Sequence, residues 1–541
     1  MMRTGIYKTV LLAAVILLAA ILLVSFIAGY KNLMSFLISL MNEQARAEKI
    51  LSLFSERKFF LLQIIILAVI AFIILLIRFR LWEYIRINYV RESFKNILKN
   101  VSSHAKWILI LPVASYIFFS FYIPITYDEA TTYIFFTSKS PLVSMMYYPA
   151  YNNHILHSIV TNFTKYIPVI DMLQRIRISS IVASVLTCIV LFSLARKYYS
   201  LNTAIIATGI AAVLSMYIYY SFTSRGYALV HLFFVLCLYC VYEIHYKNRL
   251  RHWIYFSFFS ILGFYTMPSF LYPFLTLNLV LLVSNYRLLL RQVIFGFITA
   301  AVTFVLYLPV IIVNGLDAIV NSKQVSHVTR AKAISVFPQF ASQSLSEITG
   351  ISFVAVLVIL AVAVVALVFQ KRKFELMLAA VFIVSPLLIM LLNPVIPFAR
   401  TFSYYGIFFT LVCAVPVTYY LNKISSRYMI GTIALIQVIF IYDFFLEIKK
   451  EMSATMQYAE ISKKIAGNKS YYINCVPCDA PLLYEIETGN FNHATIKFNT
   501  RQIMSADTIS NYDFILIDKV YDKTKQRTPV YSDGRMNVYA P

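Results

Sequence analysis

Thirteen apolar runs, each close to the length of a membrane-crossing helix, dominate this sequence of 541 residues. A helix needs about 20 apolar residues to cross roughly 30 Å of hydrocarbon. The sequence therefore predicts a polytopic α-helical membrane protein with about 13 transmembrane helices. The expected spans are 9–29, 59–77, 107–126, 174–194, 201–221, 226–246, 252–269, 270–286, 292–313, 350–370, 374–392, 402–421 and 428–446.

The distribution of charge argues against a nucleic-acid partner. The formal net charge is +23, yet only 13% of the residues are charged and 60% are hydrophobic. Lys and Arg gather in short segments between the apolar runs, where they orient a membrane protein. The first apolar run lacks a small-residue cleavage site, so we expect a retained helix and not a removed signal peptide.

The same basic segments predict which side of the membrane each loop faces. With a cytoplasmic N-terminus, all the inside segments are net basic, whereas the large outside segments 127–171 and 314–349 are close to neutral. This asymmetry is the one that the positive-inside rule describes. Asp128, Arg225, Arg400 and the C-terminal tail are then expected on the exoplasmic side.

The chain divides into three predicted regions. Residues 1–106 form a two-helix membrane module, whose segment Ile85–Asn100 fits either an anionic membrane surface or the cytoplasm. Residues 107–446 form the transmembrane domain. Residues 447–541 form a small exoplasmic α/β domain, because their composition becomes polar and their apolar pattern alternates.

The tail carries specific secondary-structure and cysteine patterns. Tyr471–Asn474 and Tyr512–Val520 are expected to be strands, and Glu447–Ile465 a helix. Cys475 and Cys478 are compatible with a structural disulfide or with two free thiols, while redox chemistry lacks a supporting context. The other four cysteines lie in spans and are expected to serve packing.

The first long outside loop, 127–171, concentrates polar side chains in an otherwise aromatic segment. Carboxylates at a membrane edge either cap the interface or serve a function, and we predict an active site here. Asparagines can equally cap a helix, and two histidines three residues apart are a weak metal signal without further ligands. The polar residues concerned are Asp128, Glu129, Asn152, Asn153, His154 and His157.

Several motifs in this region resemble those of the GT-C glycosyltransferases, in particular protein O-mannosyltransferases of family 39 and lipid A aminoarabinose transferases. The matching elements are Asp128-Glu129 after the first core span, His154 in YNNHILHS, the segment RIRISS, Ala195-Arg196-Lys197, and SRGYALVHLFF from Ser224 to Phe234. The motifs cover about 108–246. The sequence departs from the family pattern where Asn152-Asn153-His154-Ile155-Leu156 replaces His-Pro-Pro-Leu, and where two spans precede the usual first one.

This resemblance implies a sugar donor linked to a polyprenyl phosphate, and an acceptor on a protein, lipid or glycan. The chemistry needs a base for the acceptor and cationic groups for the departing phosphate. We expect Asp128, with Glu129 beside it, to be catalytic. The expected donor-phosphate ligands are Arg225, Arg400, His154, Arg175 and Lys332; the expected acceptor or loop residues are Asn152, Asn153 and His157. No cofactor is expected to be required, a divalent metal stays open with His154 as its weak candidate, and 314–349 is a possible lid.

Two other functions remain open from the sequence alone. A polymerase or ligase that uses a polyprenyl-diphosphate donor would share the architecture, although such enzymes rely more on basic residues in a large loop. A lipid-carrier flippase or transporter would need ionisable groups at mid-membrane. The expected location is the bacterial inner membrane, with the active site facing the periplasm.

Overall fold

The computed structural model places most of the chain. The residues it describes are 2–41, 51, 55–78, 101, 103–148, 152–168, 170–320, 326–421, 423–474, 479–489, 491–498, 512–519, 522, 528–532 and 536–540. The predicted basic segment Ile85–Asn100 and the pair Cys475 and Cys478 lie outside these residues.

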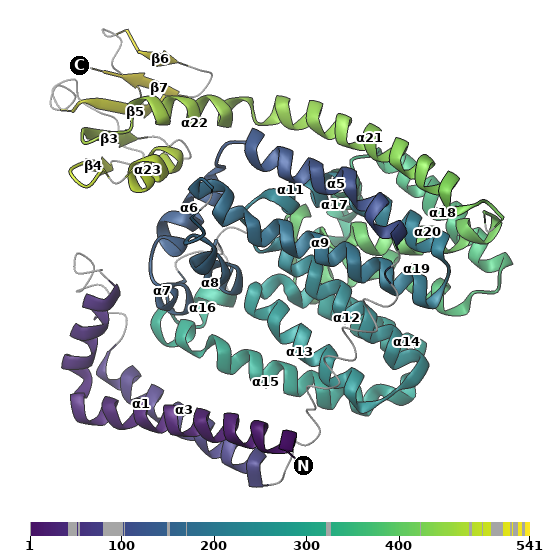
Figure 1. The fold of residues 1–541 in the computed structure, drawn as a ribbon, viewed down its shortest axis with the longest axis horizontal. Coiled ribbons are helices and arrows are strands. Elements are labelled where there is room, and N and C mark those ends of the chain that lie inside the picture. Colours follow the sequence, from purple (N-terminus) through teal and green to yellow (C-terminus); the bar gives the residue numbers. More distant parts are fainter. Residues whose placement is uncertain are drawn as a thin grey trace.

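The first two helices pair with each other before the main bundle begins. They are α1 (Met2–Met41), which bends at Gly29, and α3 (Glu56–Arg78). The amide nitrogen of Gln63 donates a buried hydrogen bond of 3.0 Å to the hydroxyl of Ser25, so that both polar groups find a partner within the pair. Met34 and Phe59 pack against Ile312 at the end of α15 (Leu289–Asn314), which attaches the pair to the bundle (Figure 1).

The main bundle contains a helix at every position where the sequence predicts a span (Figure 1). Within the described residues, seven helices are long and apolar enough to cross a membrane, or up to nine if each bent pair counts as one span. The count of thirteen crossings stays a prediction. The remaining bundle helices are α5 (Ser103–Tyr122), α9 (Met172–Tyr198), α10 (Leu201–Ala211), α11 (Ser215–Phe222), α12 (Tyr227–Lys247), α13 (Leu250–Thr266), α14 (Leu271–Ser284), α18 (Phe353–Phe369), α19 (Lys373–Leu392), α20 (Tyr405–Tyr420) and α21 (Ser426–Glu451).

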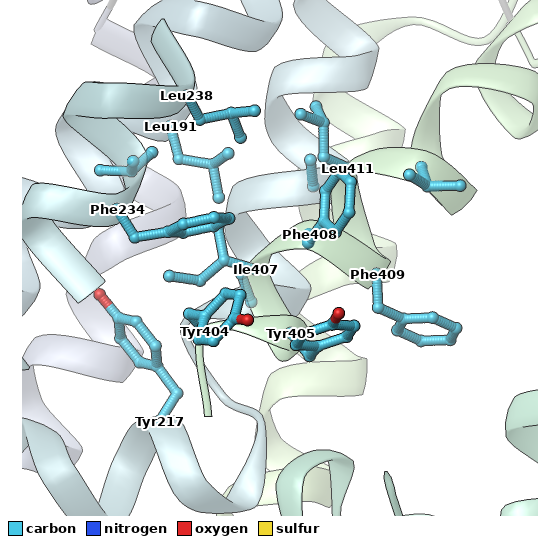
Figure 2. Packing of buried hydrophobic residues seen from close by; sticks show 14 of the residues in the cluster. Leu191, Tyr217, Phe234, Leu238, Tyr404, Tyr405, Ile407, Phe408, Phe409 and Leu411 are labelled. Carbon is cyan, nitrogen blue, oxygen red and sulfur yellow. The ribbon is translucent and has the colours of Figure 1, made fainter. Parts of the chain in front are cut away.

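The centre of the bundle is packed with aliphatic and aromatic side chains from α9, α12 and α20. Figure 2 shows Leu191, Phe234 and Phe408 meeting there, and all three are buried. α12 is buried almost all round, which fits a helix whose sequence is apolar on every face. It ends where Asn248 adopts a left-handed conformation, with φ of 43°.

The ends of α9 and α12 carry a buried ionic cluster around Glu243. This carboxylate pairs with Lys197, accepts a hydrogen bond of 2.7 Å from the Tyr198 hydroxyl, and lies 3.0 Å from the Lys247 ammonium. Arg225 precedes the opposite end of α12. The lysines and Arg225 therefore lie at different ends of the bundle.

The loop between α5 and α9 is formed by short helices. It consists of α6 (Tyr127–Thr132), the π-helical segment η3 (Tyr133–Thr137), α7 (Pro141–Met146) and α8 (Ile155–Thr164). The Lys165 ammonium donates to the carbonyl oxygens of Thr137, Ser138 and Lys139, at 2.6 to 3.2 Å. A cation at the carbonyl end of a helical segment satisfies acceptors that the helix leaves free.

The C-terminal region forms a mixed five-stranded sheet in the order β4-β3-β5-β7-β6. Both predicted strands are found, as β3 (Ser470–Asn474) and β5 (Phe514–Asp518), which pair in parallel. The predicted helix 447–465 is divided, because α21 ends at Glu451 and α22 (Ser453–Ile465) begins after Met452. The other elements are α23 (Asp479–Thr488), β4 (Thr495–Phe498), β6 (Tyr531–Ser532) and β7 (Met536–Tyr539).

This domain rests on the short helices of the loop through α23. Ala480 and Tyr484 join Ala130 and Tyr133 in one buried cluster, and the rings of Tyr133 and Tyr484 meet edge to face at 5.0 Å. Figure 1 shows α23 beside α6 at the same end of the bundle. The C-terminal domain thus covers the segment that follows Asp128.

Candidate active site

Glu129 is the most tightly bound carboxylate of the predicted loop. Its two oxygens accept hydrogen bonds of 2.8 and 2.6 Å from the Arg177 guanidinium, and both side chains are fully buried. The backbone N–H of Ser224 donates to the same carboxylate at 2.6 Å. The backbone N–H and hydroxyl of Thr126 add two bonds of 3.1 Å and complete a capping box at the start of α6.

Arg177 fastens this carboxylate to the end of α5. Its guanidinium also donates to the carbonyl oxygens of Ser120, Ile123 and Pro124, at 2.7 to 3.0 Å. Burial by itself would raise the pKa of Glu129, but the Arg177 charge and the N–H donors hold that pKa below its ordinary value. Glu129 is therefore an ionised group that joins α5, α6, α9 and the turn before α12.

Asp128 faces the other way and remains accessible. About 36% of its side chain is exposed, and its Oδ2 lies 3.6 Å from a guanidinium nitrogen of Arg225 and 3.6 Å from one of Arg400. Arg225 is almost fully buried and donates to the Asp128 carbonyl at 3.3 Å and to the Thr132 hydroxyl at 2.9 Å. One accessible carboxylate thus lies between two cations from distant parts of the chain.

His154 lies close to Arg225 and Arg400 as an uncharged imidazole. Its Nδ1 accepts a hydrogen bond of 2.8 Å from the backbone N–H of Gly226, which leaves the ring proton on Nε2. Burial, and the positive charges of Arg225 and Arg400, lower the pKa of His154 well below its ordinary value. The ring contacts Tyr227 edge to face at 5.3 Å.

His157 and the two asparagines serve the architecture of the loop. Burial, followed by the charge of Arg225, lowers the pKa of His157 to about 3, and its Nε2 lies 3.3 Å from the Ser179 hydroxyl. The Asn153 amide donates to the carbonyls of Ser144 and Tyr147, which ties α7 to α8. Asn152, half-buried, offers its carbonyl to the Thr132 hydroxyl at 3.5 Å.

The two remaining predicted phosphate ligands, Arg175 and Lys332, make their hydrogen bonds with residues outside this group. Arg175 donates to the carbonyl oxygens of Ile170 and Lys165, at 2.5 and 3.3 Å, and so holds the end of the loop. Lys332 is exposed in the first turn of α17 (Arg330–Thr349), where Thr329 caps its backbone N–H. The predicted lid segment 314–349 is thus largely helical where it is described, and α17 meets α18 at an angle of 86°.

Some residues of the site escaped the sequence prediction. Arg177 lies two residues from Arg175 in RIRISS, and the spacing alone does not tell which one enters the protein. Thr132 gave no signal, because Thr131 directly precedes it and further hydroxyl side chains follow in the same loop. Tyr227 directly follows Arg225 and Gly226, so its place beside the site could have been inferred from its position at the start of a span. In the described part of the chain, no group of three or more His, Cys, Asp or Glu side chains is arranged to hold a metal ion.

Gly226 provides a specific test of how closely the loop approaches α12. A Cβ at this position would lie 2.8 Å from the Cβ of His154 and 2.9 Å from a methyl of Thr266. We expect Gly226→Ala to destabilise the protein by about 1–3 kcal/mol, as overpacking does, and to weaken activity by displacing His154. The measurement is thermal unfolding in detergent together with sugar transfer. Gly296→Ala, where nothing lies within 4 Å, is the matched control; equal behaviour of the two variants would contradict the close approach.

Comparisons with known proteins find similarity to a family model and to a solved structure. Residues 165–313 match the family model described as dolichyl-phosphate-mannose-protein mannosyltransferase. Among solved structures, the crystal structure of ArnT from Cupriavidus metallidurans in the apo state has a TM-score of 0.50 and 11% sequence identity, covering 81% of this chain and 98% of that chain. At this identity the likeness speaks for the fold. No curated protein matches the sequence.

The fold and the partial family match define the class of protein that this chain resembles: polytopic membrane glycosyltransferases of the GT-C type. Within that class it is similar to the protein mannosyltransferase family and to ArnT, as the sequence motifs predicted. The predictions of an enzyme, of this resemblance and of a membrane location are thereby confirmed.

Proposed function

We propose that this enzyme moves a sugar from a polyprenyl-phosphate carrier to a hydroxyl or phosphate acceptor, with Asp128 as the general base. The observation that carries the proposal is the accessible Asp128 carboxylate between Arg225 and Arg400, at 3.6 Å from each. The family description names a dolichyl-phosphate-linked mannose as the donor of related enzymes, which supports a lipid monophosphate here.

The proposed reaction uses the charges of Asp128, Arg225 and Arg400. The acceptor oxygen attacks the anomeric carbon while its proton passes to Asp128. The bond from that carbon to the phosphate oxygen breaks, and the polyprenyl phosphate leaves with one additional negative charge. Arg225 and Arg400 would stabilise this charge, because a guanidinium donates two parallel hydrogen bonds to a phosphate. Inversion at the anomeric carbon follows from a single displacement.

Glu129 has a different role in this proposal. All its hydrogen-bonding capacity is used within the protein, so it is better suited to position α6 than to exchange protons. Because Asp128 is the neighbouring residue, fixing the Glu129 side chain also fixes the backbone from which Asp128 extends. We therefore assign Glu129 and Arg177 to the support of the base, and not to the reaction.

The proposed location of the reaction is the exoplasmic face. Asp128, Arg225 and the C-terminal domain lie at one end of the bundle, and the lysines around Glu243 lie at the other. By the positive-inside rule the lysine end is cytoplasmic. We extend this to a bacterial inner membrane with thirteen crossings, a periplasmic active site, and α17 as part of a lid.

Binding of undecaprenyl phosphate to the full-length protein in lipid nanodiscs tests the role of the arginines. We expect Arg400→Ala to raise the Kd at least about tenfold, since hydrogen bonds to charged groups contribute about 1.5–3 kcal/mol. Arg427→Ala, on an exposed side chain at the start of α21, is the matched control. An unchanged Kd in Arg400→Ala would contradict the proposal, and tighter binding of undecaprenyl diphosphate by the wild type would favour a polymerase or ligase.

A further inference from the structure

We infer that His231 is a positioning residue, which holds Arg400 opposite Arg225 through a hydrogen bond to Ser403. The inference rests on the proposed function, in which Arg400 binds the donor phosphate. It concerns a histidine inside the bundle that acts through the backbone of a neighbouring turn and does not contact the substrate.

The two arginines are anchored very differently. Arg225 is 4% exposed, and its side chain donates hydrogen bonds to Thr132 and to the backbone of Asp128. Arg400 is 35% exposed; it lies 3.6 Å from the Asp128 carboxylate and 4.5 Å from the ring of Phe398, and its charge also interacts with Tyr227 and Tyr220. Within the described residues its guanidinium donates no hydrogen bond, so the backbone of its own turn, η6 (Ala399–Phe402), contributes more to its placement than the backbone does for Arg225.

Ser403 connects that turn to α12. Its backbone N–H donates to the Arg400 carbonyl at 3.2 Å, so that the two residues belong to one turn of chain. Its hydroxyl lies 2.8 Å from Nε2 of His231, and both side chains are buried. Phe234, three residues after His231, packs on Tyr404 with ring centroids 4.9 Å apart (Figure 2). One face of α12 thus contacts two consecutive residues that follow Arg400.

The His231 ring is itself held in orientation. It stacks on Tyr217 with centroids 5.3 Å apart and an angle of 12° between the planes. The Tyr217 hydroxyl donates to the Ser184 carbonyl of α9 at 2.7 Å, which prevents this partner from turning. A ring fixed in this way directs Nε2 to a single place. Because Arg225 precedes the same helix, the His231–Ser403 bond sets the separation of the two guanidinium groups.

The test compares His231→Leu, which removes the bond at similar volume, with His231→Gln, whose amide can replace Nε2, and with Ser403→Ala. The readout is the Kd for undecaprenyl phosphate in nanodiscs, beside the unfolding temperature of the unliganded protein. We expect His231→Leu and Ser403→Ala to raise the Kd about 3- to 10-fold, the range of one neutral hydrogen bond. His231→Gln should restore most of the wild-type affinity, which a role in packing alone would not predict.

Combination with Arg400→Ala shows whether the effect passes through Arg400. In that background, His231→Leu should change the Kd less than twofold, because both substitutions disturb the same contact and their effects are not additive. The inference would be overturned if His231→Leu changed the Kd equally in the wild type and in Arg400→Ala. It would also be overturned if Arg400→Ala bound undecaprenyl phosphate more weakly than the wild type while His231→Leu bound it normally. If Arg400→Ala itself binds normally, the proposed function fails instead.

Discussion

Replacing Asp128 by asparagine should lower the rate of sugar transfer by about 10²- to 10⁴-fold, the usual contribution of a general base. Asparagine has nearly the same shape as aspartate but cannot accept the acceptor proton. Because Asp128 is exposed and makes long contacts of 3.6 Å to its two arginines, the loss of its charge should leave the fold intact. The measurement is turnover of a radiolabelled polyprenyl-phosphate sugar in membranes that contain the native acceptors.

Binding of the lipid phosphate separates this role from a structural one. The Asp128 carboxylate occupies the space between two guanidinium groups that a phosphate would also need. Removing its charge should therefore leave the Kd for undecaprenyl phosphate unchanged or make it smaller, while the rate of sugar transfer falls. A general structural defect would weaken binding and turnover together.

The matched control is Asp171→Asn in the same loop. Asp171 precedes α9, its side chain is exposed, and it makes no capping hydrogen bond. We expect near wild-type turnover from this variant. Turnover within twofold of wild type in Asp128→Asn would remove Asp128 as the base, and so would labelling that places residue 128 in the cytoplasm.

The second large effect is expected from Glu129→Gln, which should destabilise the protein by about 3–5 kcal/mol, because it leaves the buried Arg177 charge without its partner. The exchange keeps the size of the side chain, so the loss comes from the charge and not from a cavity. We expect a marked fall in unfolding temperature in detergent, and loss of monodisperse protein during purification. Glu460→Gln, in an exposed pair with Lys464, is the control and should leave the unfolding temperature close to that of the wild type.

The pH dependence of this pair has a definite sign. The Glu129 pKa in the folded protein is lower than the ordinary value of 4.5, so the folded state favours the ionised form. The contribution of the pair is therefore present above the ordinary pKa, and it is lost as the pH falls through the folded-state pKa. If Glu129→Gln and the control Glu460→Gln unfolded at the same temperature at neutral pH, the ion pair between Glu129 and Arg177 would not stabilise the fold as described.

Replacement of both Glu129 and Arg177 by apolar residues should restore only part of the stability that Glu129→Gln loses. Many buried ion pairs can be exchanged for packed hydrophobic side chains at little cost. Here the Arg177 guanidinium also satisfies the carbonyls of Ser120, Ile123 and Pro124 at the end of α5. Those carbonyls would lose their donors in the double variant.

Local patterns predicted the helices and strands well, and contacts between distant residues poorly. Hydropathy located the bundle helices because an apolar run over the length of one helix is a local property of the sequence. The partner of Glu129 was not predictable, since Arg177 lies 48 residues away and Arg175 offered the same chemistry. The hydrogen bond that Nδ1 of His154 accepts comes from the backbone N–H of Gly226, 72 residues along the chain. No spacing within either segment indicates this contact.

The contact of α23 with α6 and η3 has a consequence for the order in which the enzyme is made. The ribosome releases Tyr484 long after the spans have entered the bilayer, so the cluster around Ala130 and Tyr133 stays open until the last part of the chain is translated. A product truncated before α23 would carry Asp128, Arg225 and Arg400, but would lack the surface that packs on Ala130 and Tyr133. Synthesis of α23 thus becomes a condition for covering the segment that follows Asp128.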